Sequence, residues 1–127
     1  MSKQPFNSIA RIRSFKHAFR GIWLIFKTQH NMWIHLLAIV FVIALGIYTN
    51  LNLNEWLFIV FAIGLVLVAE LVNTGIEYLG DAITDEENEK VRNAKDVSAG
   101  AVLMAALVAL VVAGLVFIPR LIPLFTS

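Results

Sequence analysis

Three long apolar stretches divide this chain, and a helix of about 20 such residues crosses a lipid bilayer. The first runs from Met32 to Tyr48 and is interrupted only by His35. The second contains the apolar run Trp56–Ala69, and the third contains the run Ala99–Ile118. The pattern predicts an all-α integral membrane protein whose three transmembrane helices span residues of about 32–49, 54–80 and 97–118.

Polar and helix-breaking residues predict where these helices begin and end. We expect Asn54 to cap the second helix, because an amide side chain can accept a hydrogen bond from the first turn. Residues 81–96 are mostly polar and predict a loop, in which residues 84–87 can start a short helical turn. Pro119 is expected to end the third helix, since proline cannot continue one.

The segment before the first span has the periodicity of an amphipathic helix. Its apolar residues recur at steps of three and four, and most of its cations fall outside that stripe. A helix of this kind lies in the interface of an anionic membrane with its cations towards the headgroups. We therefore expect an N-terminal amphipathic surface helix over residues of about 6–29; the alternative is an amphipathic helix that packs on another domain. The apolar stripe consists of Phe6, Ile9, Ile12, Phe15, Phe19, Ile22 and Phe26.

Charge predicts the orientation of the spans. Hydrophobic residues make up 59% of the 127 residues and charged residues 15%, which fits one small membrane domain. No acid precedes Glu55, whereas six Lys or Arg residues do. By the positive-inside tendency, the N-terminus and the 81–96 segment face the cytoplasm, and the C-terminus with Arg120 faces outward. The chain has no cysteine, which excludes disulfides and thiolate metal sites. We also expect no nucleic-acid partner.

Four polar side chains follow one another at the cytoplasmic end of the second span. Glu70, Asn73, Glu77 and Asp81 fall within about 80° of each other on a helix. Ionisable residues this deep in a membrane are costly and usually mark function. Glu70 can accept a proton from an alcohol, and Asn73 can orient a hydroxyl or a phosphate oxygen. Glu77 and Asp81 can bind a divalent cation together with phosphate oxygens.

A Lys95-Asp96 pair stands at the cytoplasmic start of the third span. The lysine can act as a point charge for phosphate, and the aspartate can ligate a metal or hold the lysine in place. Taken singly, each acid has a structural alternative as a helix cap or an interfacial residue. Together they favour a site that handles metal and phosphate over a proton or cation pathway. Neither a G-x-x-x-x-G-K-[ST] nor a G-x-G-x-x-G motif occurs, and His35 is expected to be a hydrogen-bonded interfacial residue.

The motif E-x-x-N-[ST]-x-[IV]-E at 70–77, followed by Asp81 and by A-K-D at 94–96, resembles the signature of the prokaryotic diacylglycerol kinase family. That family includes the undecaprenol kinases. The stretch Ser14–Ile22 is similar to the family's N-terminal surface helix, so the resemblance covers nearly the whole chain. It implies a homotrimer in the bacterial cytoplasmic (inner) membrane, with a cytoplasmic N-terminus and active sites shared between subunits.

The resemblance also implies a reaction and a role for each site residue. The family transfers the γ-phosphate of ATP to the hydroxyl of a membrane lipid, with Mg²⁺. By position, Glu70 would be the general base, and Asn73 and Ser98 would join it in binding the lipid substrate. Metal binding would fall to Glu77 and Gln29, and the residues at the nucleotide would be Glu77, Asp81, Lys95, Asp96 and Gln29.

Two positions depart from the family pattern. Gln29 stands where many members have a metal-binding glutamate, and Arg11 and Arg13 straddle the place expected for the family's N-terminal arginine. The lipid acceptor, diacylglycerol or undecaprenol, is not fixed by any motif. Two alternatives without catalysis stay open at this point: a small membrane subunit that handles protons or cations through Glu70, and a degenerate family member that acts as a scaffold.

Overall fold

The computed structural model describes residues 8–126, and their regular structure is helical throughout. It comprises α1 (Ser8–Thr28), α2 (His30–Tyr48), α3 (Leu53–Ile83) and α4 (Glu89–Thr126). The helices α2, α3 and α4 are long and apolar enough to cross a membrane, which confirms the predicted all-α fold with three candidate spans and an N-terminal helix. Phe6 and Asn7, where the surface helix was expected to begin, lie outside the described residues.

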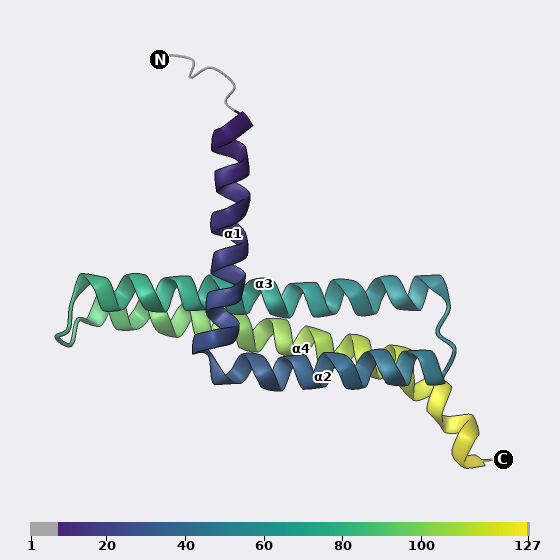
Figure 1. The fold of residues 1–127 in the computed structure, drawn as a ribbon. Helices are drawn as coiled ribbons and strands as arrows, with labels where there is room; N and C mark the ends of the chain where they lie inside the picture. Colours follow the sequence, from purple (N-terminus) through teal and green to yellow (C-terminus); the bar gives the residue numbers. More distant parts are fainter. Residues whose placement is uncertain (1–7, 127) are drawn as a thin grey trace, which may run out of the picture.

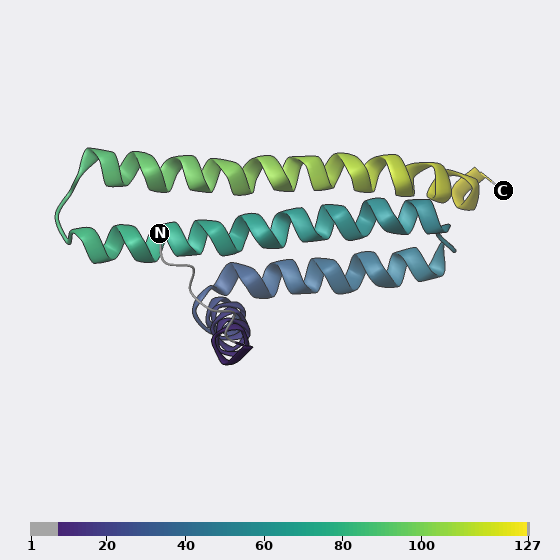
Figure 2. The same ribbon diagram turned by 90° about the horizontal axis from the view of Figure 1, so that it is seen from above.

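The helices α2, α3 and α4 run side by side, and α1 lies across them (Figures 1 and 2). The chain turns between α1 and α2 at a single residue, Gln29, whose backbone is extended at φ −104° and ψ 109°. Its N–H still donates to the carbonyl of Ile25 at 2.9 Å, and its carbonyl accepts from Met32 at 3.1 Å. Because hydrogen bonds continue on both sides of the corner, the direction of α1 relative to α2 is well defined.

The second span begins with a capping box. The Asn52 side chain accepts a hydrogen bond from the N–H of Glu55 at 3.0 Å, and the Glu55 carboxylate accepts from the N–H of Asn52 at 2.8 Å. The prediction of Asn54 as the cap is therefore wrong. Asn52 is the better cap because the residue three positions later is a glutamate that can return the hydrogen bond, whereas Leu57 follows Asn54 at that spacing.

The connection between α3 and α4 is shorter than the predicted loop over 81–96. The helix α3 continues to Ile83, and α4 already begins at Glu89, eight residues before Val97. Asn88 explains the early start, since its side-chain oxygen accepts from the N–H groups of Lys90 at 3.0 Å and Val91 at 3.2 Å. Residues 84–87 bend rather than form the helical turn that the sequence suggested. Both helices therefore extend the bundle as a two-helix projection beyond α1 (Figure 1).

Proline does not end the third span as predicted. The helix α4 continues through Pro119 and Pro123 to Thr126. Each proline removes one backbone donor and crowds the preceding turn, which bends a helix when the rest of it persists. The last turns of α4 accordingly leave the line of the bundle near the C-terminus (Figure 1).

The small apolar core lies at the end of the bundle that holds the 49–52 connection. It is formed by Leu51, Ile59, Val116 and Phe117. Gly46 is needed beside it, because a Cβ on this residue would stand 2.6 Å from the indole of Trp56. Most other large apolar side chains of the three long helices are exposed, as expected for a surface covered by lipid or by further subunits.

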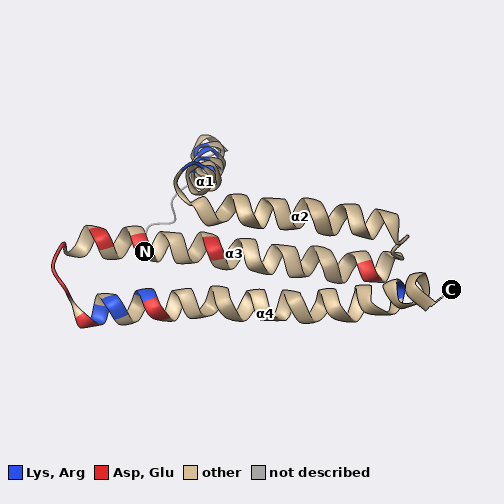
Figure 3. Cartoon of the chain, turned by 90° about the horizontal axis from the view of Figure 1, so that it is seen from below, with Lys and Arg blue, Asp and Glu red and all other residues tan. Residues whose placement is uncertain are grey.

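Charged side chains are concentrated at the other end of the bundle and on α1 (Figure 3). Glu70 lies in the middle part of α3, and Glu55 pairs with Arg120 at the end of the bundle that holds the core. The charged residues of the projection and the basic helix α1 thus both lie away from the end of the bundle that holds the apolar core (Figure 3).

Candidate active site

The polar stripe of α3 changes from buried to exposed along its length. Glu70 is 9% exposed, Asn73 and Glu77 are half-buried, and Asp81 is exposed. The stripe extends over about 16 Å, given a rise of about 1.5 Å per residue. It therefore connects the apolar part of the bundle with its charged end, and each of its four side chains has a polar partner.

The partner of Glu70 is His35 on α2. The distance from His35 Nε2 to Glu70 Oε1 is 2.6 Å, and the two side chains are 26% and 11% exposed. This pair joins α2 to α3 at the deep end of the stripe. The prediction that His35 is hydrogen-bonded is confirmed, although its partner was not foreseen.

The partners of Asn73 are Ser98 on α4 and Glu77 on its own helix. The hydroxyl of Ser98 lies 2.7 Å from Asn73 Oδ1 and 2.8 Å from the carbonyl of Lys95. The amide Nδ2 of Asn73 donates to Glu77 Oε1 at 3.2 Å. Ser98, Asn73 and Glu77 thus form one continuous chain of hydrogen bonds across the α3–α4 contact.

Lys95 on α4 forms an ion pair with Asp81 on α3. Its aliphatic part passes so close to Gly80 that a Cβ on this glycine would lie 2.7 Å from Lys95 Cε. The ammonium keeps further donors for another acceptor, because it has three and Asp81 Oδ1 takes one. Next to the pair is an open cleft of about 580 Å³, lined by Lys95, Arg92, Asp81 and the 84–89 segment.

Gln29 lies at the corner between α1 and α2, half-buried. Its neighbour Thr28 accepts a hydrogen bond from the hydroxyl of Tyr78 on α3 at 3.0 Å. Since Tyr78 follows Glu77 directly, this bond brings the corner of the chain to the level of Glu77. The structure therefore places Gln29 and Glu77 in the same region of the bundle.

Asp96 is exposed, and within residues 8–126 its side chain makes no hydrogen bond or ion pair. The part of the chain that the structure describes also has no cluster of three or more His, Asp or Glu side chains that could hold a metal ion alone. A metal held by Glu77 and Gln29 therefore needs ligands from elsewhere, and phosphate oxygens are the usual source for magnesium. The metal and nucleotide assignments stay predictions.

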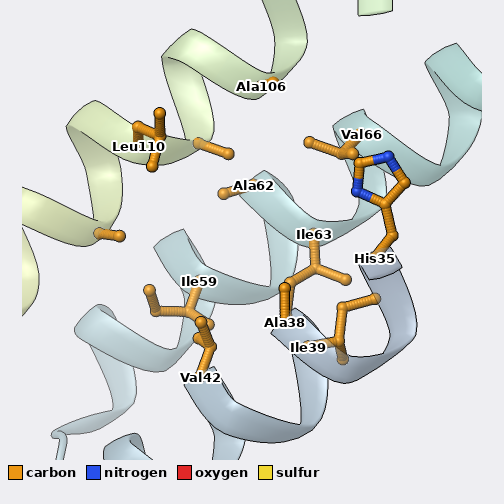
Figure 4. A pocket seen from close by; sticks show the side chains of 12 residues that line it. His35, Ala38, Ile39, Val42, Ile59, Ala62, Ile63, Val66, Ala106 and Leu110 are labelled. Carbon is orange, nitrogen blue, oxygen red and sulfur yellow. The ribbon is translucent and has the colours of Figure 1, made fainter. Parts of the chain in front are cut away.

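An apolar cavity of about 300 Å³ lies between α2, α3 and α4, and His35, the partner of Glu70, lines it. His35 is its one polar lining residue and stands at one end, as Figure 4 shows. The other lining side chains are aliphatic and include Ile39, Val66 and Leu110. The polar stripe therefore has an apolar cavity at its deep end and a charged cleft at its exposed end.

Sequence reasoning missed the partners of the site residues more than the residues themselves. The sequence did hold a signal for the partner of Glu70, because His35 is the single polar interruption of the first apolar run. Tyr78 and Gly80 carry no comparable signal, because their roles depend on which residues of α1 and α4 they meet.

The model of the family described as prokaryotic diacylglycerol kinase matches residues 16–117. The chain belongs to this family. Two relatives agree with the match: the chain is 38% identical over 121 residues to the undecaprenol kinase of Bacillus subtilis, with 94% of this chain and 98% of the relative covered. It is 35% identical over 112 residues to the diacylglycerol kinase of Synechocystis, with 87% of this chain and 64% of that relative covered.

This family member is a lipid kinase, and the features of the bundle agree with that assignment. The E-x-x-N-[ST]-x-[IV]-E and A-K-D motifs, at 70–77 and 94–96, lie inside the matched region and at the contact between α3 and α4. The family match and the names of the two relatives favour a lipid kinase over the alternative of a proton- or cation-handling subunit.

Proposed function

We propose that this kinase transfers the γ-phosphate of ATP to the hydroxyl of a membrane lipid, with Mg²⁺, and that Glu70 is the general base. The observation that carries the proposal concerns Glu70, a buried carboxylate that is hydrogen-bonded to His35 at the end of an apolar cavity. On the other side of Glu70, polar side chains lead along α3 to a charged cleft. A lipid hydroxyl can reach Glu70 from the apolar side, and a water-soluble nucleotide from the exposed side.

In the proposed step, the carboxylate of Glu70 accepts the proton of the lipid hydroxyl. The freed oxygen forms a bond with the γ-phosphorus while the bond from that phosphorus to the bridging oxygen of ADP breaks. The products are the lipid phosphate, ADP and protonated Glu70, which returns its proton to solvent. Asn73 and Ser98 hold the lipid hydroxyl against Glu70 in this arrangement.

The nucleotide is assigned to the exposed half of the stripe. Lys95 contacts a phosphate with the N–H donors that are not bonded to Asp81. Asp96 lies next to Lys95 in the sequence and belongs to the same nucleotide site. The Asn73 amide donates to one carboxylate oxygen of Glu77. The other carboxylate oxygen can therefore bind a metal. Gln29 adds a neutral oxygen. When Mg²⁺ is bound with ATP, it offsets negative charge on the phosphate oxygens.

We further infer a homotrimer with shared active sites in the bacterial cytoplasmic membrane, with a cytoplasmic N-terminus. A single bundle leaves the polar stripe half open, so side chains of a second subunit are needed to enclose the substrates. Small residues of α4 allow close helix contacts; they are Ala101, Ala105, Ala109, Ala113 and Gly114. The basic residues of α1 and the charges of the projection support a cytoplasmic location for that end.

The acceptor lipid is diacylglycerol or undecaprenol. One relative, of which 98% is covered by the match to this chain, is named undecaprenol kinase. This name supports testing undecaprenol beside diacylglycerol. The two lipids share one primary hydroxyl next to an apolar body. The apolar cavity is too small for either whole lipid and does not distinguish between them.

The proposal is tested by transfer of labelled γ-phosphate from ATP in mixed micelles with Mg²⁺. Diacylglycerol and undecaprenol are offered in parallel, and Glu70→Gln is the matched variant. We expect label in one lipid and a loss of at least about 100-fold in the variant, the usual contribution of a general base. Cross-linking should give trimers for both proteins. Full transfer by Glu70→Gln would remove this residue as the base, and no transfer to either lipid by wild type would contradict the proposed reaction.

A further inference from the structure

The pair formed by His35 and Glu70 joins two different helices at the polar end of an apolar cavity (Figure 4). The separation of 2.6 Å between Nε2 and Oε1 is that of a hydrogen bond between an imidazole and a carboxylate. An ionised carboxylate only accepts hydrogen bonds, so Nε2 must carry the hydrogen when Glu70 is charged. The neutral ring then has its lone pair on Nδ1.

We propose that His35 is a positioning residue for the catalytic carboxylate. This inference rests on the proposed function, because it acts through Glu70 as the general base. The Nε2–H group fixes Oε1, which leaves Oε2 of the same carboxylate to face the lipid hydroxyl. A general base must hold such a geometry within hydrogen-bond reach of the proton that it takes.

The surroundings of the pair make this hydrogen bond important for the orientation of Glu70. The cavity that His35 lines is otherwise aliphatic, so its α2 and α4 walls offer the carboxylate no other donor. Both side chains are mostly buried, and water therefore competes weakly for the bond. Without the imidazole, the side chain of Glu70 would be free to adopt other rotamers.

Two substitutions of His35 test its role as a hydrogen-bond donor. His35→Leu removes the donor and keeps an apolar side chain of similar volume, whereas His35→Gln keeps an N–H donor. The matched control is His30→Gln, which removes an exposed imidazole at the start of the same helix. For each protein, kcat and KM for ATP and lipid are measured in mixed micelles.

We expect His35→Leu to lower kcat by about 10- to 100-fold, the effect of losing one hydrogen bond to a charged group, with little change in the KM for ATP. His35→Gln should restore most of the wild-type kcat, because its amide can still donate to Glu70. His30→Gln should keep the wild-type kcat and KM.

A wild-type kcat in His35→Leu, or a kcat in His35→Gln as low as that of His35→Leu, would overturn the inference. If His35→Leu does not assemble, His35→Ala takes its place in the comparison. The proposed function fails separately: it fails if wild type transfers no phosphate to either lipid or if Glu70→Gln stays active, whatever the His35 variants do. Transfer that depends on Glu70 but has a kcat independent of His35 would contradict this inference only.

Discussion

The hydroxyl of Ser98 on α4 and the carbonyl oxygen of the Asn73 side chain on α3 are 2.7 Å apart. Ser98 is 6% exposed, so this contact is shielded from water. The amide nitrogen of Asn73 donates to Glu77 on the same helix, which leaves the amide oxygen to face the Ser98 hydroxyl on α4. If the amide were reversed, its oxygen would face the Glu77 carboxylate, which accepts hydrogen bonds and repels another acceptor.

From this contact we predict that Ser98→Ala lowers phosphoryl transfer by up to about tenfold, the value of one neutral hydrogen bond. The loss arises because the Asn73 amide is no longer held in one orientation. The measurement is kcat/KM for the lipid in mixed micelles. The control is the same substitution in an Asn73→Ala background, where Ser98 should have little further effect if it acts through Asn73. Equal losses in both backgrounds would mean that Ser98 acts independently.

Gly80→Ala is predicted to raise the KM for ATP several-fold. The new methyl group would stand 2.7 Å from Lys95 Cε and 3.0 Å from Val91 Cγ1, so the lysine must leave its place beside Asp81. Alanine is also the better helix former by roughly 0.5–1 kcal/mol. The structure therefore predicts weaker nucleotide binding without a less stable helix.

The matched control is Gly64→Ala on the same helix, since a Cβ there meets no atom within 4 Å. Both variants are compared by KM for ATP and by thermal unfolding in detergent. The lysine argument would be contradicted if Gly80→Ala kept the wild-type KM, or if Gly64→Ala raised it equally.

The sequence was sufficient to predict the helices and the membrane spans because apolar runs and the 3.6-residue period report burial in lipid directly. The stripe from Glu70 to Asp81 was predicted on the same basis, as spacing alone puts these residues on neighbouring turns. Helix ends were predicted less well. Asn52 and Asn88 are caps because of hydrogen bonds with residues two or three positions later, and Pro119 bends α4 instead of ending it.

Contacts between helices could not be predicted from the sequence. The pairing of His35 with Glu70 and of Ser98 with Asn73 depends on how α2 and α4 are rotated against α3. That rotation is set by close approaches such as those at Gly46 and Gly80, which have no periodic pattern. Residue types at a site can thus be proposed from spacing, whereas their orientation requires the packed helices.

Arg120→Ala is predicted to lower the unfolding temperature and to leave kcat nearly unchanged. The guanidinium donates to both carboxylate oxygens of Glu55, at 3.1 and 2.6 Å, and to the carbonyls of Thr49 and Asn50 at 3.1 and 3.0 Å. It therefore ties the end of α4 to the connection between α2 and α3. Glu55 is about 22 Å along α3 from Glu70, which is too far for direct contact with the reaction.

Arg120→Ala should be more damaging than Glu55→Gln, since the arginine loses all four contacts and the glutamine can still accept from Asn52 and Arg120. The measurement is thermal unfolding in one detergent, with turnover measured on the same samples. A loss of kcat in Arg120→Ala at temperatures where the protein stays folded would show that the end of the bundle that holds Arg120 affects the active site.

Gln29→Glu is predicted to lower the Mg²⁺ concentration for half-maximal activity several-fold. A carboxylate offers a hard, charged oxygen to Mg²⁺ where the amide offers a neutral one. The corner that holds this residue is tied to α3 by the bond from Tyr78 to Thr28, so the new charge would stay at the level of Glu77. Glu77→Gln should have the opposite effect and raise the Mg²⁺ requirement.

The double variant Gln29→Glu/Glu77→Gln tests whether the two positions serve one ion. If they do, it should recover part of the Mg²⁺ affinity that Glu77→Gln loses, since one charged ligand is restored at the same site. The Mg²⁺ titration is run at fixed ATP for all four proteins, with Asn31→Asp as a control that adds a carboxylate two residues further along the chain. Equal titrations for wild type and Gln29→Glu would mean that residue 29 is not a metal ligand in this kinase. A similar gain in Asn31→Asp would assign the effect to negative charge in general.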